Sequence, residues 1–223
     1  MSQQQIISAA QALERLREGN ARFAQNLRSV ESLTTNAQRE ALVKGQRPFA
    51  IILSCADSRV PSELVFDCGL GTLFVVRVAG NIVAPSIIGS IEFAAATFGT
   101  QLVAVVGHSH CGAVKAALDV ARGVSTVPSE NIADIVERVM PAVGELAREQ
   151  APEKELLARA VRTNVRMSVE QLRHGSRILE QLCRERRLFI VGGEYSLETG
   201  RVDFFDLGPL EKSPPVSSSE SRN

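Results

Sequence analysis

The sequence predicts an α/β fold, with a mostly parallel central sheet of about four parallel strands plus one edge strand, flanked by helices. One observation behind this prediction is that short apolar runs typical of buried strands alternate with helix-periodic segments. Another is that 223 residues suffice for one α/β domain with a sizeable core, and no linker or internal repeat divides them. We therefore expect a single domain over residues 1–210 and a disordered Ser- and Pro-rich tail over residues 211–223.

The N-terminal segment is predicted to be helical. Over residues 6–26, apolar side chains recur at steps of three and four, with charged residues on the other face. Gly19 and Asn20 are expected to bend or interrupt this helix, and a second helix is expected over residues 32–43. Because these helices precede the sheet, we expect them either to pack on it or to embrace a partner subunit.

The rest of the chain alternates between strands and helices. The expected parallel strands, followed by the edge strand, are residues 49–53, 73–78, 102–106, 188–191 and 202–205. The expected helices are residues 61–66, 85–98, 112–120, 132–149 and 153–186. Pro85 suits a first helical turn because proline has no N–H to donate there. Pro141 and Gly144 are expected to break the helix that contains them.

Composition excludes several classes of function. Lys and Arg together number 25 and so do Asp and Glu, so no basic excess favours nucleic acid. Trp is absent and Tyr195 is the only tyrosine, which argues against a stacking surface for single strands. No apolar run approaches the ~20 residues of a membrane span, and the N-terminus lacks the pattern of a signal peptide. We expect a cytoplasmic protein, with no nucleic-acid or membrane partner.

Two short motifs carry candidate chemistry. Residues 55–59 (Cys-Ala-Asp-Ser-Arg) and residues 108–112 (His-Ser-His-Cys-Gly) each follow an apolar run that is predicted to be a strand. Sites in open α/β sheets form at the carboxyl ends of strands. If the two strands are neighbours, Cys55, His108 and Cys111 converge, and two thiolates with one imidazole would hold zinc and leave a fourth position open.

Other readings of these residues stay open at this point. A buried cysteine is usually a small hydrophobe, and a lone histidine is usually just hydrogen-bonded. Asp57 and Arg59 would, away from a ligand, be an ordinary surface ion pair of little energetic value. The pairing of two such motifs, each directly after a strand, favours the metal site.

The motifs resemble those of the beta-class carbonic anhydrases. Residues 74–81 and 89–94 also resemble family segments, and the resemblance extends from the helices leading to Phe23 through the hairpin at residues 195–205. It implies an α/β fold that forms a homodimer, often paired into a homotetramer. It also implies reversible hydration of carbon dioxide to bicarbonate and a proton.

The resemblance implies a role for each motif residue. Cys55, His108 and Cys111 would hold one zinc ion per chain. Asp57 and Arg59 would form the catalytic dyad that orients a zinc-bound hydroxide. Asp57 is also a possible fourth zinc ligand in a closed state.

The resemblance also implies substrate-binding residues. Gln46 matches a glutamine that reaches the pocket, often across the dimer interface. Phe74, Ala79 and Phe93 match positions that line the pocket, and for Ala79 and Phe93 a plain core role is the alternative. The backbone N–H of Gly112, which follows the last ligand, is expected to donate to a bound oxygen.

One position departs from part of the family. Some bacterial members bind bicarbonate at a regulatory site made by a Trp, an Arg and a Tyr. Arg77 and Tyr195 match the last two, but Ile52 stands where the Trp would be. The sequence is therefore expected to belong to the subclass without that site.

Two alternative functions remain at this stage. The same fold and zinc site would suit a hydrolase of carbonyl sulfide or carbon disulfide. A non-catalytic zinc or redox protein is the other alternative, since thiolate ligands can be oxidised. Asp57 and Arg59 argue against it, because a structural zinc site closes with a fourth ligand and does not need such a pair.

Overall fold

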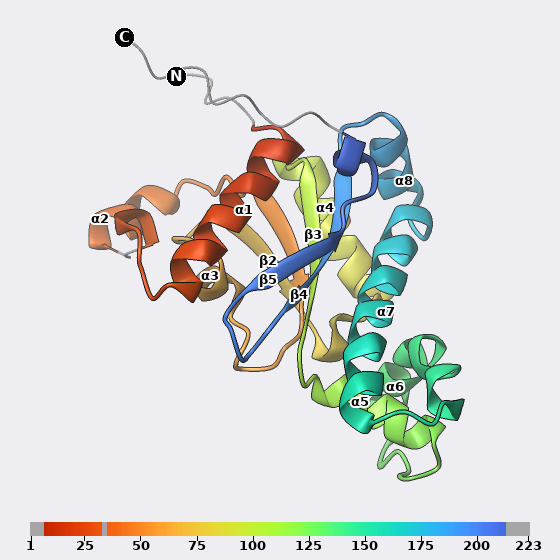
Figure 1. Cartoon of the computed structure of the whole chain (residues 1–223). Helices are drawn as coiled ribbons and strands as arrows, with labels where there is room; N and C mark the ends of the chain where they lie inside the picture. The colour runs from red at the N-terminus through yellow and green to blue at the C-terminus, as the bar shows by residue number, and fades with distance from the viewer. Residues whose placement is uncertain (1–6, 33–34, 213–223) are drawn as a thin grey trace.

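The computed structural model describes residues 7–32 and 35–212 and has a five-stranded sheet at its centre (Figure 1). The spatial order is β2-β1-β3-β4-β5. The first four strands pair in parallel and β5 runs antiparallel to β4, so the predicted sheet is confirmed. In chain order the strands are β1 Ala50–Ser54, β2 Leu73–Arg77, β3 Leu102–His108, β4 Phe189–Tyr195 and β5 Val202–Asp206.

The helices cover both faces of this sheet (Figure 1). The α-helices are α1 Ala9–Ala24, α2 Asn36–Leu42, α3 Ser62–Val65, α4 Pro85–Phe98, α5 Gly112–Ala121, α6 Glu130–Val143, α7 Glu153–His174 and α8 Arg177–Arg184. Short 3-10 helices are η1 Val30–Ser32, η2 Ala79–Asn81, η3 Leu146–Arg148 and η4 Gly208–Lys212. None of the helices in the described part of the chain is long and apolar enough to cross a membrane.

The core forms on both faces because strand side chains alternate. Ile52 belongs to the cluster that includes α1, whereas Ile51 and Leu53 belong to the cluster that includes α4 and the C-terminal half of α7. All residues of β1 and β3 are buried. Their near-continuous apolar sequence is what a parallel strand covered on both faces requires.

The first helix runs without a break through Gly19 and Asn20, so the expected interruption is wrong. Both residues are buried inside α1. A side chain at position 19 would lie 2.0 Å from the carbonyl oxygen of Phe66, so glycine allows the close approach of α3. The Asn20 amide donates to the carbonyls of Val65 and Gly200. These two residues therefore serve packing and tertiary hydrogen bonds.

Other boundaries also differ from the prediction. Pro141 lies inside α6 and does not end it. The long helical region over residues 153–186 is divided at Gly175, and the Ser176 side chain then caps α8 by accepting from the Leu179 N–H. In the predicted tail, residues 211–212 end η4, and residues 213–223 lie outside the described residues.

The N-terminal arm packs on its own chain. Leu13 and Leu16 of α1 are buried in the core. The buried carboxylate of Asp67 accepts hydrogen bonds from Nε of Arg22, in the last turn of α1, at 2.6 Å and from the N–H of Ser29, after α1, at 2.9 Å. Asp67 thus ties the segment after α1 to the end of α3.

We expect Asp67→Asn to lower the free energy of unfolding by about 1.5–3 kcal/mol at pH 7, the usual value of hydrogen bonds to a charged group. Burial would raise the pKa of Asp67, but hydrogen bonds from Arg22, Ser32 and Ser29 outweigh it and lower the pKa. The stabilisation is therefore complete above the unfolded pKa of ~3.9 and is lost as pH falls through the lower folded value. Urea titrations of the wild type and of Asp67→Asn between pH 7 and pH 2 measure this difference in the free energy of unfolding. A difference that stays constant with pH would contradict the expectation.

Candidate active site

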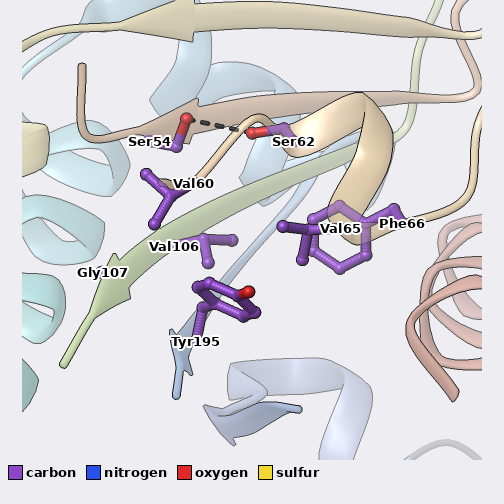
Figure 2. Close-up of a pocket in the computed structure, with 8 residues that line it drawn as sticks. All are labelled: Ser54, Val60, Ser62, Val65, Phe66, Val106, Gly107 and Tyr195. Carbon is purple, nitrogen blue, oxygen red and sulfur yellow. Dashed lines mark hydrogen bonds between the residues drawn. The ribbon is translucent and has the colours of Figure 1, made fainter. Parts of the chain in front are cut away.

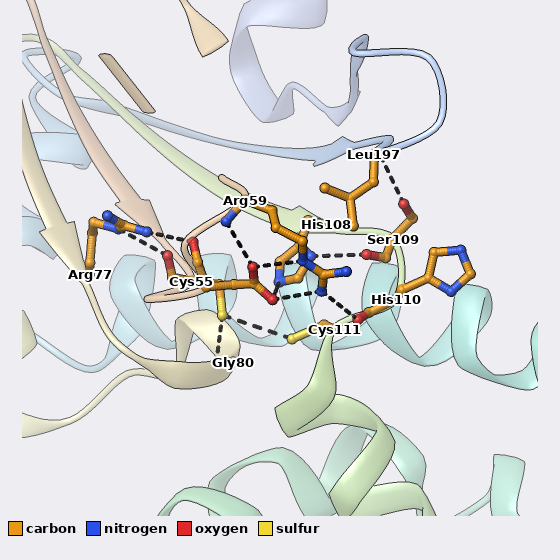
Figure 3. Close-up of polar contacts among 10 residues, drawn as sticks. Cys55, Arg59, Arg77, Gly80, His108, Ser109, His110, Cys111 and Leu197 are labelled. Carbon is orange, nitrogen blue, oxygen red and sulfur yellow. Dashed lines mark hydrogen bonds and ion pairs between the residues drawn. The ribbon is translucent and has the colours of Figure 1, made fainter. Parts of the chain in front are cut away.

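The two predicted motifs meet at one edge of the sheet (Figure 3). Cys55 follows the last residue of β1, and His108 is the last residue of β3. Strands β1 and β3 are hydrogen-bonded neighbours, with Ser54 paired with Val106. Cys111 directly precedes α5. The carboxyl ends of adjacent parallel strands therefore bring the three candidate ligands together, as the motif positions predict.

The geometry of this trio fits a metal ion. The ligand atoms of Cys55, His108 and Cys111 all lie within 4.8 Å of one another, and the two Sγ atoms are 4.0 Å apart. The three residues are buried. Two sulfurs and one imidazole nitrogen form a donor set typical of zinc, with room for a fourth ligand.

The imidazole of His108 is oriented for metal binding. Its Nδ1 lies 2.9 Å from the carbonyl oxygen of Ser109. A carbonyl only accepts, so Nδ1 carries the proton and Nε2 presents a lone pair. Nε2 is buried and has no hydrogen-bond partner among the described residues. A buried polar atom without a partner needs an explanation, and a metal ion at the thiols supplies one.

The two thiols are in contact, so a negative charge on one disfavours a second charge on the other. The S–H of Cys111 stabilises the Cys55 thiolate and, against the opposing effect of burial, lowers the pKa of Cys55, with help from the Gly80 N–H. The pKa of Cys111 is raised because Cys55 and burial both disfavour a second negative charge. Burial also raises the pKa of Cys68 to about 11 and raises that of Cys183. Among the described residues, only Cys55 and Cys111 lie with a histidine in a group that could hold a metal ion, and a bound metal favours the thiolate.

Asp57 and Arg59 form a bidentate ion pair beside the trio. Arg59 Nε and Nη2 donate to the two carboxylate oxygens at 2.9 and 2.7 Å, and the Arg59 N–H donates at 2.9 Å. These bonds hold the pKa of Asp57 well below its usual range. Asp57 Oδ2 lies 4.0 Å from His108 Nε2. The carboxylate is therefore ionised and fixed next to the candidate metal position.

A buried turn donates a hydrogen bond to the sulfur of Cys55. In η2, Gly80 has φ +69° and donates its N–H to Cys55 Sγ at 3.4 Å. Asn164 of α7 donates to the Gly80 carbonyl at 2.8 Å, and Ser168 donates to the Asn81 carbonyl at 3.1 Å. This support was not predicted from the sequence. The sequence feature that indicates this support is a pair of polar residues, Asn164 and Ser168, four positions apart on the buried face of α7.

Arg77 and Tyr195 make separate contacts. Arg77 Nε and Nη2 donate to the backbone carbonyls of Cys55 and Asp57 at 3.1 and 2.6 Å, so Arg77 braces the first motif. Tyr195 instead borders a small cavity of about 10 Å³, room for roughly one water molecule (Figure 2). Its lining residues are Ser54, Val60, Ser62, Val65, Phe66, Val106, Gly107 and Tyr195. Ile52 is fully buried in the core.

The expected pocket residues separate into two groups. Ala79 adjoins the Gly80 turn, and Gly112 begins α5 directly after Cys111, so both lie at the candidate site. Gln46 is exposed and precedes the start of β1, at the end opposite Cys55.

The two expected pocket phenylalanines also lie away from the site of their own chain. Phe74 is paired with Ile51, near the start of β1. Phe93 is 57% exposed and packs with Phe74 and Phe98 in an aromatic cluster, with ring centroids 6.0–6.5 Å apart. Within one chain, the structure does not bring Gln46, Phe74 or Phe93 to the trio.

Comparisons of the sequence with known proteins agree on one family. Residues 50–202 match the family described as carbonic anhydrase. Carbonic anhydrase 2 of Mycobacterium tuberculosis is 38% identical over 191 residues, which span 86% of this chain and 90% of that protein. The carbonic anhydrase of Mycolicibacterium smegmatis is 39% identical over 199 residues, spanning 86% and 91%.

Solved structures agree with this assignment. The beta-carbonic anhydrase CcaA superposes with a TM-score of 0.70 at 25% identity, over 87% of this chain and 98% of that chain. A tetrameric beta-carbonic anhydrase of Sordaria macrospora superposes with a TM-score of 0.67 at 24% identity, over 76% and 86%, and shows likeness of fold. By sequence and fold together, this chain belongs to the beta-class carbonic anhydrase family.

Proposed function

We propose that the protein catalyses the zinc-dependent, reversible hydration of carbon dioxide to bicarbonate and a proton, at the site formed by the two motifs. The observation that carries this proposal is the buried trio with an unpartnered His108 Nε2, placed next to the fixed carboxylate of Asp57. Zinc held by Cys55, His108 and Cys111 would supply a Lewis acid that makes a nucleophile from water near neutral pH.

The chain's own residues then position the reaction. Asp57, kept ionised by Arg59, accepts a hydrogen bond from the attacking oxygen and so directs its lone pair at the substrate carbon. The Gly112 N–H, at the start of α5, donates to an oxygen of the bound substrate or product. Ala79 provides apolar surface for an uncharged substrate.

We further propose that the active assembly is a homodimer or homotetramer. Gln46, Phe74 and Phe93 lie away from the trio of their own chain, and the exposed ring of Phe93 offers apolar surface to a second copy. A partner subunit would bring these residues to the pocket. The thiolate ligands also favour a reducing compartment, which supports a cytoplasmic location.

Stopped-flow hydration of carbon dioxide at mildly alkaline pH, on protein of measured zinc content, tests this function. We expect fast turnover with about one zinc per chain, the stoichiometry of a three-ligand catalytic site. Full zinc occupancy without turnover of carbon dioxide would overturn the proposal. The same assay with carbonyl sulfide and carbon disulfide then separates the alternative hydrolase from a non-catalytic zinc protein.

A further inference from the structure

The loop of residues 108–111, here called the ligand loop, has an unusual backbone. It carries two of the three candidate zinc ligands, His108 and Cys111. Between them, His110 has φ +58°. This left-handed conformation is uncommon for residues other than glycine and is strained, so it persists only where the surroundings hold it.

The turn between β4 and β5, residues 196–201 and here called the hairpin turn, holds this loop. At the end of β4, Tyr195 accepts a hydrogen bond from the Ser109 N–H at 2.9 Å. In the hairpin turn, the Leu197 N–H donates to Ser109 Oγ at 2.9 Å. Figure 3 shows Leu197, Ser109 and His110 next to one another beside the trio. The ligand loop is therefore fastened to the end of β4 and to the hairpin turn.

Glu198 binds both intervening residues of the ligand loop with one carboxylate. Its Oε2 accepts from Ser109 Oγ at 2.9 Å, and its Oε1 lies 2.7 Å from His110 Nε2. Ser196 Oγ donates to the same carboxylate at 3.1 Å and fixes it within the hairpin turn. The Glu198 side chain thus restrains Ser109 and His110, the two residues between the candidate ligands His108 and Cys111.

The restraint reaches the candidate ligand His108 through Ser109. The Ser109 carbonyl accepts from His108 Nδ1, which sets the tautomer and the orientation of the imidazole. Partners of this kind commonly change metal affinity by about 10–100-fold when removed. Glu198 and His110 are themselves 52% and 50% exposed in their side chains. Exposed pairs of this kind add little to global stability, so the effect of Glu198 should be local.

We propose that Glu198 is a positioning residue that holds the ligand loop closed and thereby sets the lifetime of bound zinc. This inference rests on the proposed zinc site. It assigns to the hairpin turn the task of keeping His108 and Cys111 in binding geometry. Glu198 contacts neither the trio nor the substrate, and it acts through Ser109 and His110.

Zinc release into a chromophoric chelator tests the proposal on the full-length, zinc-loaded protein. We expect Glu198→Ala to release zinc about 10-fold faster or more. Glu198→Gln keeps one acceptor oxygen and should fall between it and the wild type. Glu149→Ala is the matched control, since Glu149 is an exposed carboxylate that binds Arg159 through both oxygens away from the site. Its release rate should equal that of the wild type.

The outcomes separate this inference from the proposed function. Release from Glu198→Ala within two-fold of the wild-type rate would overturn the positioning role alone. The zinc-free forms of Glu198→Ala and the wild type are also compared in thermal stability. A loss of stability in the variant large enough to account for its faster zinc release would overturn the positioning role, because Glu198 would then act through general stability. A wild-type protein that binds no zinc would overturn the proposed function and, with it, this inference.

Discussion

Each of Cys55→Ser, His108→Ala and Cys111→Ser should abolish stable zinc binding and carbon dioxide hydration together. Every variant leaves two good donors in a site whose atoms all lie within 4.8 Å of one another. Loss of the Lewis acid removes several kcal/mol of transition-state stabilisation, so hydration should fall by roughly 10³-fold or more. Zinc content by atomic absorption and stopped-flow hydration, on the same preparations, measure both effects.

Cys68→Ser is the matched control for the two cysteine variants. Cys68 is a half-buried thiol outside the trio, and burial raises its pKa. The control should keep full zinc and full activity. A ligand variant that retained zinc at the wild-type level would remove that residue from the ligand set.

Asp57→Ala should keep zinc and lose most of its turnover. Asp57 is not required to fill the trio, but its carboxylate lies 4.0 Å from His108 Nε2 and is fixed by Arg59. Loss of an orienting group of this kind costs about 10²–10³-fold in kcat. Comparing kcat and KM in stopped-flow assays at matched zinc content checks the expectation, and the fall should lie mainly in kcat.

Two variants complete this test. Arg59→Ala leaves the carboxylate in place but frees it to move, so its turnover should fall less than that of Asp57→Ala. Asp134→Ala removes the same kind of bidentate pair, with Arg138, from the exposed face of α6 and should leave turnover unchanged. A near-wild-type rate for Asp57→Ala would contradict its proposed role.

The sheet and the meeting of the motifs were predictable from local sequence. β1 and β3 are continuous apolar runs, and a parallel sheet places the ends of neighbouring strands at one edge. The strand predicted over residues 188–191 instead continues to Tyr195 through Gly192 and Gly193. A side chain at position 192 would lie 2.9 Å from Val165 of α7, so this glycine serves close packing and does not end the strand.

The features that local sequence did not predict depend on partners far along the chain. Asn20 and Asn164 are polar residues on largely buried helix faces, and their partners are backbone groups of the hairpin turn and of η2. Glu198 meets Ser109 across 89 positions. Such contacts follow from the assembled fold, and no periodicity within one segment indicates them.

The side chain of Asn20 has a consequence for the order of assembly during synthesis. It donates to the carbonyl of Gly200 and accepts from the N–H of Val202, across 180 and 182 positions. A nascent chain can pair β1 with β3 before these partners leave the ribosome, whereas α1 cannot complete its hydrogen bonds until then. Contacts of such long range are slow to form, so docking of α1 and closure of the hairpin turn over the ligand loop should be late, coupled events of biogenesis.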